Sequence, residues 1–315
     1  MYAKQISQEP AIFEIAVPFP NISTSATNCY VIKDRGEVLV VDTGAPTKEA
    51  GDYFLAGLEE LDVDRENASY FLTHFHLDHA GLVDRLISKS APLYVGQVEF
   101  DRTRKSKSAD LVDELAHHLK HLGANAQEIE ACRRLEKFGS EFVSEDHNLR
   151  FVSDGDTLTI GSLRLEVVGT GGHTEGHLSL FEPRSGFFIG GDHLLFVISP
   201  SIDYFSGNRD SLSVYLDNLS KIKDLPIKAL LPAHGTIRDD FNDRADWLIR
   251  HHEKRLDELV AKANSNSKLL RIETIKQLAW NVPSANWEKI SVEQRSIIII
   301  QGLVLLNHLE KTGRL

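Results

Sequence analysis

The stretch "FLTHFHLDHAG", residues 71–81, places three histidines and an aspartate within six positions, directly after two apolar residues. The segment "ASYFLTH" that leads into it is a short apolar run typical of a buried β-strand. Imidazole nitrogens and a carboxylate oxygen are ligands that suit a divalent cation such as zinc. His74 and His76 point the same way in an extended chain, because side-chain direction repeats every second residue. Asp78 and His79 follow on the next turn, where they can face a second metal ion beside the first.

The segments around this motif alternate between strand-like and helix-like patterns. "CYVIKD" and "EVLVVDTG" predict consecutive strands joined at the turn-forming "DRGE", and residues 47–61 have the apolar spacing of a helix. "RFVSDGDTLTIGSLRLEVVGT" predicts two strands around a turn at Gly161, and "LSLFEPRSGFFIGGD" predicts a further hairpin. The chain is therefore expected to combine β-sheets with helices.

Two segments lack strand patterns altogether. Residues 97–140 are charged and helix-favouring, which predicts a helical insertion that could cover a pocket. From about residue 240 onward the chain reads as helices, the last of which has a capping-box spacing at Ser291 and Gln294. We therefore expect a catalytic domain at 1–240 and a C-terminal helical module at 241–315. The four isoleucines of "IIIIQGLVLL" face all sides of a helix, so this last helix must be buried.

The composition narrows the classes of partner. The chain has 315 residues, 42% of them hydrophobic, and a formal net charge of −11, which argues against a broad polyanion-binding surface. Residues 246–315 nevertheless hold 11 basic and 8 acidic side chains, so a nucleic-acid partner stays open without being favoured. Cys29 and Cys132 have no recurring spacing, and no apolar run has the length of a signal peptide or a bilayer span. We expect a cytoplasmic protein without a membrane partner.

Further metal-ligating side chains follow other short apolar strands. "GTGGHTEGH" supplies His177, "FIGGDH" supplies Asp192 and "LLPAHG" supplies His234, each in a turn that contains glycine. Five motifs thus occur in order between about residues 20 and 240: "VVDTG", "THFHLDHAG", "GGHTEGH", "GGDH" and "PAHG". In these motifs the sequence resembles the metallo-β-lactamase fold superfamily. The resemblance implies the α+β class, with a four-layered αββα sandwich, a dinuclear metal site and a C-terminal helical module.

The resemblance also implies a role for each ligand. His74, His76 and His177 would hold the first metal ion, Asp78, His79 and His234 would hold the second, and Asp192 would bridge both. Asp42, in "VVDTG", would support a ligand histidine rather than bind metal, or would simply cap a turn at the strand end. His173, the first histidine of "GGHTEGH", is expected to be structural.

Such a site would activate a bridging hydroxide for hydrolysis, with Asp78 as a catalytic residue that orients the nucleophile or passes a proton. The expected cofactors are two divalent metal ions, zinc in the first place, with iron or manganese as alternatives. The nearest architectures are glyoxalase II-like enzymes and lactamase-like hydrolases with a C-terminal winged-helix-like module, which implies a thioester or a related ester or lactone as substrate. Two alternatives remain: an endoribonuclease or phosphodiesterase of the same fold, and a mononuclear iron persulfide dioxygenase. Leu77 stands where transfer-RNA-maturing ribonucleases of this fold usually have glycine.

Substrate contacts are expected from the loop "ISPSIDYFSGN" at 198–208 and from the insertion. Tyr204 and Phe205 could line an apolar acyl pocket or belong to the core, and His193 lies at the edge of the pocket, toward substrate or solvent. The expected partner is a small molecule, and the C-terminal helices could either cap the pocket or form a homodimer contact. Six further histidines fall on helical or polar stretches and are expected at the surface: His117, His118, His121, His147, His251 and His252.

Overall fold

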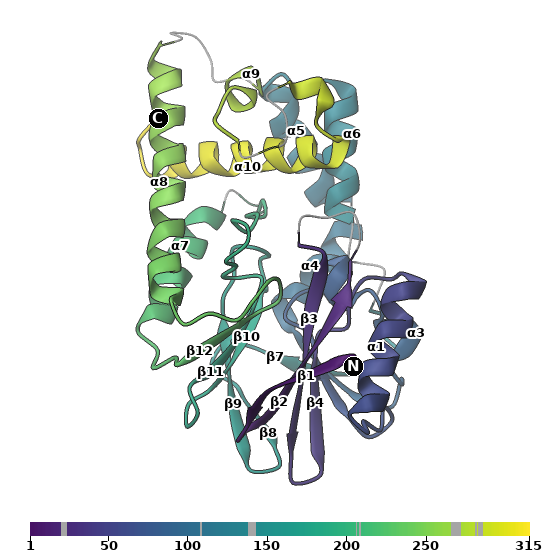
Figure 1. Cartoon of the computed structure of the whole chain (residues 1–315). Coiled ribbons are helices and arrows are strands. Elements are labelled where there is room, and N and C mark those ends of the chain that lie inside the picture. Colours follow the sequence, from purple (N-terminus) through teal and green to yellow (C-terminus); the bar gives the residue numbers. More distant parts are fainter. Residues whose placement is uncertain are drawn as a thin grey trace.

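Two β-sheets packed face to face form the centre of the molecule (Figure 1). The computed structural model describes residues 1–315 except 20–23, 108, 138–142, 206, 208, 266–271, 281 and 283–285. The strands of the first sheet are β1 (Ala3–Gln8), β2 (Ala11–Pro18), β3 (Ala26–Asp34), β4 (Glu37–Val41), β5 (Ser69–Phe71), β6 (Pro92–Gly96) and β7 (Asn148–Val152). Those of the second are β8 (Thr157–Ile160), β9 (Leu163–Gly169), β10 (Leu178–Glu182), β11 (Phe187–Gly191) and β12 (Ala229–Pro232).

The order of the strands follows the chain. In the first sheet β1 to β4 form an antiparallel meander, and β4 to β7 run parallel because helices connect them. In the second sheet β11 and β12 are parallel and the other pairs are antiparallel. The helices are α1 (Lys48–Glu60), α2 (Leu77–Ala80), α3 (Val83–Leu86), α4 (Gln97–Lys107), α5 (Ala109–His121), α6 (Ala126–Lys137), α7 (Ser211–Lys223), α8 (Phe241–Ser265), α9 (Ile272–Lys276) and α10 (Val292–Lys311), with a 3₁₀ turn η1 (Trp287–Lys289).

Three apolar layers hold these elements together. Alternate residues of β3 point to opposite faces of the first sheet: Val31 packs toward α1, and Tyr30 packs toward the second sheet. The third layer lies between the second sheet and the helices that include α7 and α8. Helices therefore cover the outer face of each sheet, which confirms the predicted α+β class and the αββα arrangement of layers.

Several local predictions are confirmed. The turn between β3 and β4 falls at Arg35 and Gly36, both with positive φ (48° and 86°), which is the geometry of a tight hairpin. The side chain of Ser291 accepts a hydrogen bond from the backbone N–H of Gln294 and caps α10, as the capping-box spacing indicates. The sequence patterns do not predict the N-terminal hairpin of β1 and β2, although it forms one edge of the first sheet.

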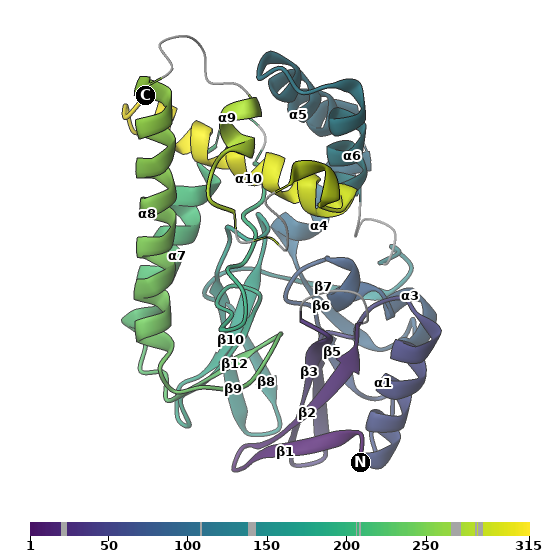
Figure 2. The ribbon, with the colours of Figure 1, turned by 45° about the horizontal axis from the view of Figure 1, so that its top comes forward.

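The insertion and the C-terminal helices meet above one end of the sandwich. In Figures 1 and 2, α10 runs from the pair α5 and α6 across to α8, so it bridges two segments that are far apart in the chain. The side chains of Ile298, Ile299 and Ile300 are buried, as predicted, whereas Ile297 is 41% exposed. A Cβ atom on Gly302 would lie 2.2 Å from Cγ2 of Ile275, so only glycine allows α9 to approach α10 this closely.

The C-terminal segment is helical, and its described residues form no wing. Within 241–315 these residues make up helices, turns and irregular segments without a strand, and α10 ends only four residues before Leu315. The likeness to a winged-helix module is therefore limited to its helices. Within the described part of the chain, no helix has both the length and the apolar character needed to cross a bilayer.

Candidate metal centre

The predicted ligands meet at one edge of the sandwich because they follow the ends of neighbouring strands. His74 and His76 lie in the loop after β5, which leads into α2 with its Asp78 and His79. β11 and β12 are parallel, so the ends that precede Asp192 and His234 lie side by side. The loop between β9 and β10 brings the "GGHTEGH" motif to the same edge.

A first cluster is formed by three histidines. Nε2 of His74 lies 3.0 Å from Nδ1 of His76, and Nε2 of His173 lies 3.0 Å from the same atom. His74 and His173 are buried and His76 is half-buried, and one nitrogen from each could bind a single metal ion. Nε2 of His173 also lies 3.4 Å from Asp192 Oδ2.

A second cluster adjoins the first. Nε2 of His234 lies 3.3 Å from Oδ2 of Asp78 and 3.3 Å from Oδ1 of Asp192. Nε2 of His79 lies 3.7 Å and 3.6 Å from the same two carboxylate oxygens. Asp192 therefore contacts both clusters, where a bridging carboxylate would lie.

The outer nitrogens of these histidines are held by the protein. Nδ1–H of His79 donates to Asp42 Oδ2 (2.8 Å), that of His234 donates to the carbonyl of Ala26 (2.7 Å), and that of His173 donates to the carbonyl of Ser201 (2.7 Å). Such bonds fix the tautomer, so that the lone pair of Nε2 points into the cluster.

Asp42 contacts more than one of these groups. It has a positive φ of 61°, and its carboxylate accepts hydrogen bonds from the backbone N–H of Thr73 (2.9 Å) and from the Thr73 hydroxyl. Oγ1 of Thr73 lies 3.0 Å from Nδ1 of His74. Asp42 is thus in direct contact with His79 and is linked through Thr73 to His74.

The two histidines of "GGHTEGH" lie differently from the expectation. Nδ1 of His177 lies 2.8 Å from Oγ1 of Thr170, and Nε2 accepts a hydrogen bond from the backbone N–H of Asp192 (3.1 Å). Both nitrogens of His177 are therefore occupied, and the first cluster contains His173 in its place. The physical reason is that His177 directly precedes β10, which fixes its direction, whereas His173 lies on the turn that begins at Gly172 (φ 134°).

Charge is distributed unevenly over the site. Burial and the neighbouring imidazoles lower the pKa of His74 well below its usual value, and burial lowers the pKa of His76 to about 3. Burial also opposes protonation of His234, but the carboxylates of Asp192 and Asp78 outweigh it and raise the pKa of His234 to about 10. His74 and His76 therefore offer neutral imidazoles, while the carboxylates of the second cluster attract positive charge.

The donor set fits divalent cations. Nε2 of His79 and Oδ1 of Asp192 are buried and have no hydrogen-bond partner among the described residues. A buried polar atom without a partner carries a free-energy cost, which a bound cation would remove. Nitrogen and carboxylate donors of this kind suit zinc, iron and manganese alike.

A cavity of about 410 Å³ opens directly on this site. His76, Asp78 and His173, which belong to the two clusters, are among the residues that line it. Arg102 of α4 and Asp203 form an ion pair in its wall, which also includes polar side chains of α10. The insertion, the loop at 198–208 and the C-terminal helix thus all contribute to the cavity. The apolar residues that line it come from four parts of the chain: Phe75, Leu77, Leu135, Ile202, Ile297 and Ile300.

The three residues expected to contact substrate do not line this cavity in the described structure. Tyr204 is 2% exposed, and its hydroxyl is hydrogen-bonded to Glu114 and lies 2.7 Å from Nδ1 of His118. Phe205 is 3% exposed, and His193 is fully buried beside Tyr215. All three are buried in the protein, and from the segment around Tyr204 it is Ile202 and Asp203 that line the cavity instead.

Two of the six histidines expected at the surface are also buried. Nε2 of His147 lies between Lys89 and Asp84, and His252 packs against the ring of Tyr215. Neither lies in the metal-ligating clusters of the described residues.

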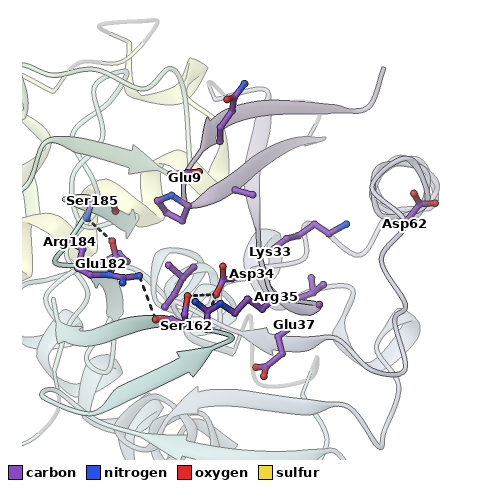
Figure 3. Close-up of a pocket in the computed structure, with 16 residues that line it drawn as sticks. Glu9, Lys33, Asp34, Arg35, Glu37, Asp62, Ser162, Glu182, Arg184 and Ser185 are labelled. Atoms are coloured by element: carbon purple, nitrogen blue, oxygen red, sulfur yellow. Dashed lines mark hydrogen bonds and ion pairs between the residues drawn. The ribbon is translucent and has the colours of Figure 1, made fainter.

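A larger cavity, of about 860 Å³, lies at the other end of the strands (Figure 3). It is lined by the turn between β3 and β4, whereas Asp42 follows the opposite end of β4. Its charged groups serve the hairpins: Asp34 accepts from the hydroxyl of Ser162, and Glu182 accepts from the backbone N–H of Ser185. The charged groups of this cavity therefore connect and stabilise the turns of the hairpins.

Sequence reasoning missed several residues of the site. Glu99, Ile297 and Gln301 lie far from every motif, and they reach the cavity only through the packing of α4 and α10. His173 could have been favoured from its place within the glycine-rich turn, since a loop residue is freer to point into a site than the residue that precedes a strand.

Known proteins resemble the chain along most of its length. "Beta-lactamase-like protein 2 homolog" of Caenorhabditis elegans is 23% identical over 265 residues, which cover 82% of this chain and 72% of that protein. Its namesake in Drosophila melanogaster is 24% identical over 273 residues, covering 84% and 78%. Among solved structures, a metallo-beta-lactamase family protein from Thermus thermophilus has a TM-score of 0.77 at 24% identity and covers 98% of this chain and 95% of its own.

A beta-lactamase domain protein from Burkholderia ambifaria has a TM-score of 0.75 at 19% identity, with 99% and 89% coverage. These two structures show that the fold is shared over nearly the whole chain. The family model of the metallo-beta-lactamase superfamily matches residues 23–234, which span every residue of the two clusters. The chain therefore belongs to the metallo-β-lactamase superfamily.

Proposed function

We propose that this protein is a metal-dependent hydrolase of thioesters or related esters that have an apolar acyl group. The observation that carries the proposal is the largely apolar cavity whose lining includes His76, Asp78 and His173 of the two clusters. Two relatives support the choice of reaction. They bear the names "Atrochrysone carboxyl ACP thioesterase", from Aspergillus fumigatus, and "Hydroxyacylglutathione hydrolase", from Rhodospirillum rubrum. The second is 32% identical but over only 36% of this chain.

The proposed ligands form two neighbouring sets. His74, His76 and His173 would hold one divalent ion, and Asp78, His79 and His234 would hold the other, with Asp192 between them. When bound, divalent ions supply a water-derived nucleophile at neutral pH and Lewis acidity toward a carbonyl oxygen. His177 then serves the site indirectly, because its Nε2 holds the backbone N–H of Asp192 in place.

The side chains around the cavity perform the remaining tasks. Asp78 lies on the cavity wall and can accept a proton from the nucleophile or return it to the leaving thiol. Leu77, Ile202 and Ile300 exclude water from the reacting carbonyl and provide apolar surface for the acyl group.

The charges at the cavity disfavour a nucleic-acid strand as the group that enters it. Arg102 is already paired with Asp203, and Glu293 and Glu99 add negative charge to the wall. A phosphodiester backbone would meet acidic and apolar surface here rather than the basic groove that nucleic-acid binding requires. The nuclease alternative is therefore disfavoured. The experiment below distinguishes it, and the persulfide dioxygenase alternative, from thioester hydrolysis.

The test measures metal content and activity on matched substrates. Purified protein is assayed by elemental analysis and then with acyl-CoA and acylglutathione thioesters of increasing acyl length, single-stranded RNA, and glutathione persulfide with oxygen. We expect two divalent ions per chain and thioester hydrolysis that the variant His173→Gln loses. Cleavage of RNA alone, or oxygen uptake with one iron per chain, would overturn the proposal.

A further inference from the structure

The carboxylate of Glu99 lies between the two loops that bear the histidines of the first cluster. Oε1 accepts a hydrogen bond from the backbone N–H of Phe75 (3.1 Å), and Oε2 accepts one from the backbone N–H of Gly176 (2.9 Å). Phe75 stands between His74 and His76 in the chain, and Gly176 stands three residues after His173. One side chain thus joins two segments that are about a hundred residues apart.

The position of Glu99 is tightly defined. The residue is 4% exposed and belongs to the first turn of α4, where the helix dipole favours a negative charge. Burial raises the pKa of this carboxyl, whereas the charge of Arg102 and the two backbone amides favour its ionised form. A buried carboxylate is costly unless its oxygens are satisfied, and here each oxygen has its own amide donor.

The backbone at this contact provides an independent observation. A Cβ atom on Gly176 would lie 2.2 Å from the backbone nitrogen of Glu99 and 2.6 Å from its Cα. The loop therefore approaches α4 so closely that only glycine fits. Phe75 is 3% exposed and its ring packs edge-on against Phe100, the neighbour of Glu99, with ring centroids 6.5 Å apart. Both histidine-bearing loops are packed on the same turn of the helix.

We propose that Glu99 is a positioning residue that sets the geometry of the first metal site by holding the loops of His74, His76 and His173 at a fixed separation. The inference rests on the metal site of the proposed function. It identifies a residue outside the five sequence motifs that positions the metal ligands. It also gives the helical insertion a role in the site besides covering the cavity, since α4 is its first helix.

The substitution Glu99→Gln separates this role from packing, because it keeps the shape of the side chain. A glutamine has one acceptor oxygen and an NH₂ group, so it can accept from only one of the two backbone amides. The matched control is Asp101→Asn, which makes the same change of charge on the same helix at an exposed side chain that is hydrogen-bonded to Gln97.

Two readouts test the proposal. In metal-stripped protein, hydrogen exchange of peptides that span residues 73–79 and 171–177 should become faster in Glu99→Gln and stay unchanged in Asp101→Asn. In the loaded protein, the dissociation constant for Zn²⁺ should rise by roughly 10- to 100-fold, the range found for groups that support metal ligands. The visible spectrum of the Co²⁺-loaded protein should change as well.

The outcomes distinguish the two proposals. Wild-type exchange rates and Zn²⁺ affinity in folded Glu99→Gln would overturn the role of Glu99 while the metal site stands. A wild-type chain that binds no divalent ion would overturn the proposed function and this inference together. If Glu99→Gln does not fold, Glu99→Asp answers the same question, because it keeps the charge but is one methylene too short to reach both amides.

Discussion

Gln301 of α10 is hydrogen-bonded to both backbone groups of Ile202. Its Oε1 accepts from the N–H of Ile202 (3.0 Å), and its Nε2 donates to the carbonyl of the same residue (2.5 Å). The C-terminal helix thereby holds the backbone of Ile202, which lines the cavity together with its neighbour Asp203. The amide of Gln301 pairs with this residue in the way that the backbone of a neighbouring strand would.

Replacing Gln301 by alanine should loosen this wall without touching the metal ligands. Each of the two lost hydrogen bonds contributes about 1 kcal/mol to holding Ile202 in the cavity wall. Substrate binding should weaken when this wall loosens, so we expect KM for the acyl substrate to rise by roughly tenfold, with a smaller change in kcat. Steady-state kinetics give the two constants separately. Gln294→Ala, at an exposed position of the same helix, is the control. A roughly tenfold loss of kcat in Gln301→Ala with KM unchanged would contradict a role for Gln301 in the cavity wall.

The two histidines of "GGHTEGH" should respond differently to substitution. His173→Gln removes an imidazole from the first cluster, so we expect the metal content to fall from two ions per chain to about one. His177→Gln should keep both ions, because the glutamine oxygen can still accept from the backbone N–H of Asp192. Elemental analysis after gel filtration measures both contents. Loss of metal in His177→Gln alone would restore the ligand assignment expected from the sequence.

Asp42→Asn should weaken the metal site while preserving the fold. Asparagine tolerates the positive φ of 61° at this position, but its single acceptor oxygen cannot serve both Thr73 and His79. We expect Zn²⁺ affinity to fall by roughly 10- to 100-fold, measured by competition with a chromophoric chelator. Circular dichroism and the thermal midpoint of the stripped protein serve as controls for folding. Unchanged affinity would mean that Asp42 only caps the turn after β4.

The acyl-length preference should depend on Ile297. This side chain lines the cavity and is 41% exposed, so shortening it opens space and costs little stability. We expect Ile297→Ala to raise kcat/KM for long acyl thioesters relative to short ones, by roughly fivefold or more for about 1 kcal/mol of altered contact. Val292→Ala is a matched control, since Val292 is 42% exposed on the same helix and is not among the described residues that line the cavity. If kcat/KM depended on acyl length in the same way in both variants, the acyl group would not lie against Ile297.

The layers and the ligand-bearing strand ends could be predicted from the sequence because both are local patterns. The strand patterns of β3 and β9, the turn at Gly36 and the cap at Ser291 each depend on neighbours in the chain, and each is found in the structure. The cavity depends on contacts between α4, α6, α10 and the loop at 198–208, which no periodicity reveals. The position of Tyr204 shows the same limit: an aromatic residue near a ligand gives no sign of which side of the loop it faces.

The choice between His173 and His177 depends on a finer point. Both histidines stand beside glycine and four residues apart, so composition and spacing do not separate them. The difference is a matter of direction: β10 begins at Leu178 and orients His177 toward Thr170 and the backbone of Asp192. Only the path of the backbone through Gly172 shows that His173 points to His76.

The packing of α10 on α9 gives a prediction about stability. In Gly302→Ala the new Cβ would lie 2.2 Å from Cγ2 of Ile275, so one helix must move, and overpacking of this kind costs about 1–3 kcal/mol. Urea unfolding should show that loss for Gly302→Ala. The double variant Gly302→Ala/Ile275→Ala removes the clashing atoms, so it should lose less stability than the sum of the two single losses. Because α10 also carries Gln301, Gly302→Ala should raise KM as well, and the double variant should lower it again. Additive losses in the double variant would show that Gly302 is required for some reason other than the contact with Ile275.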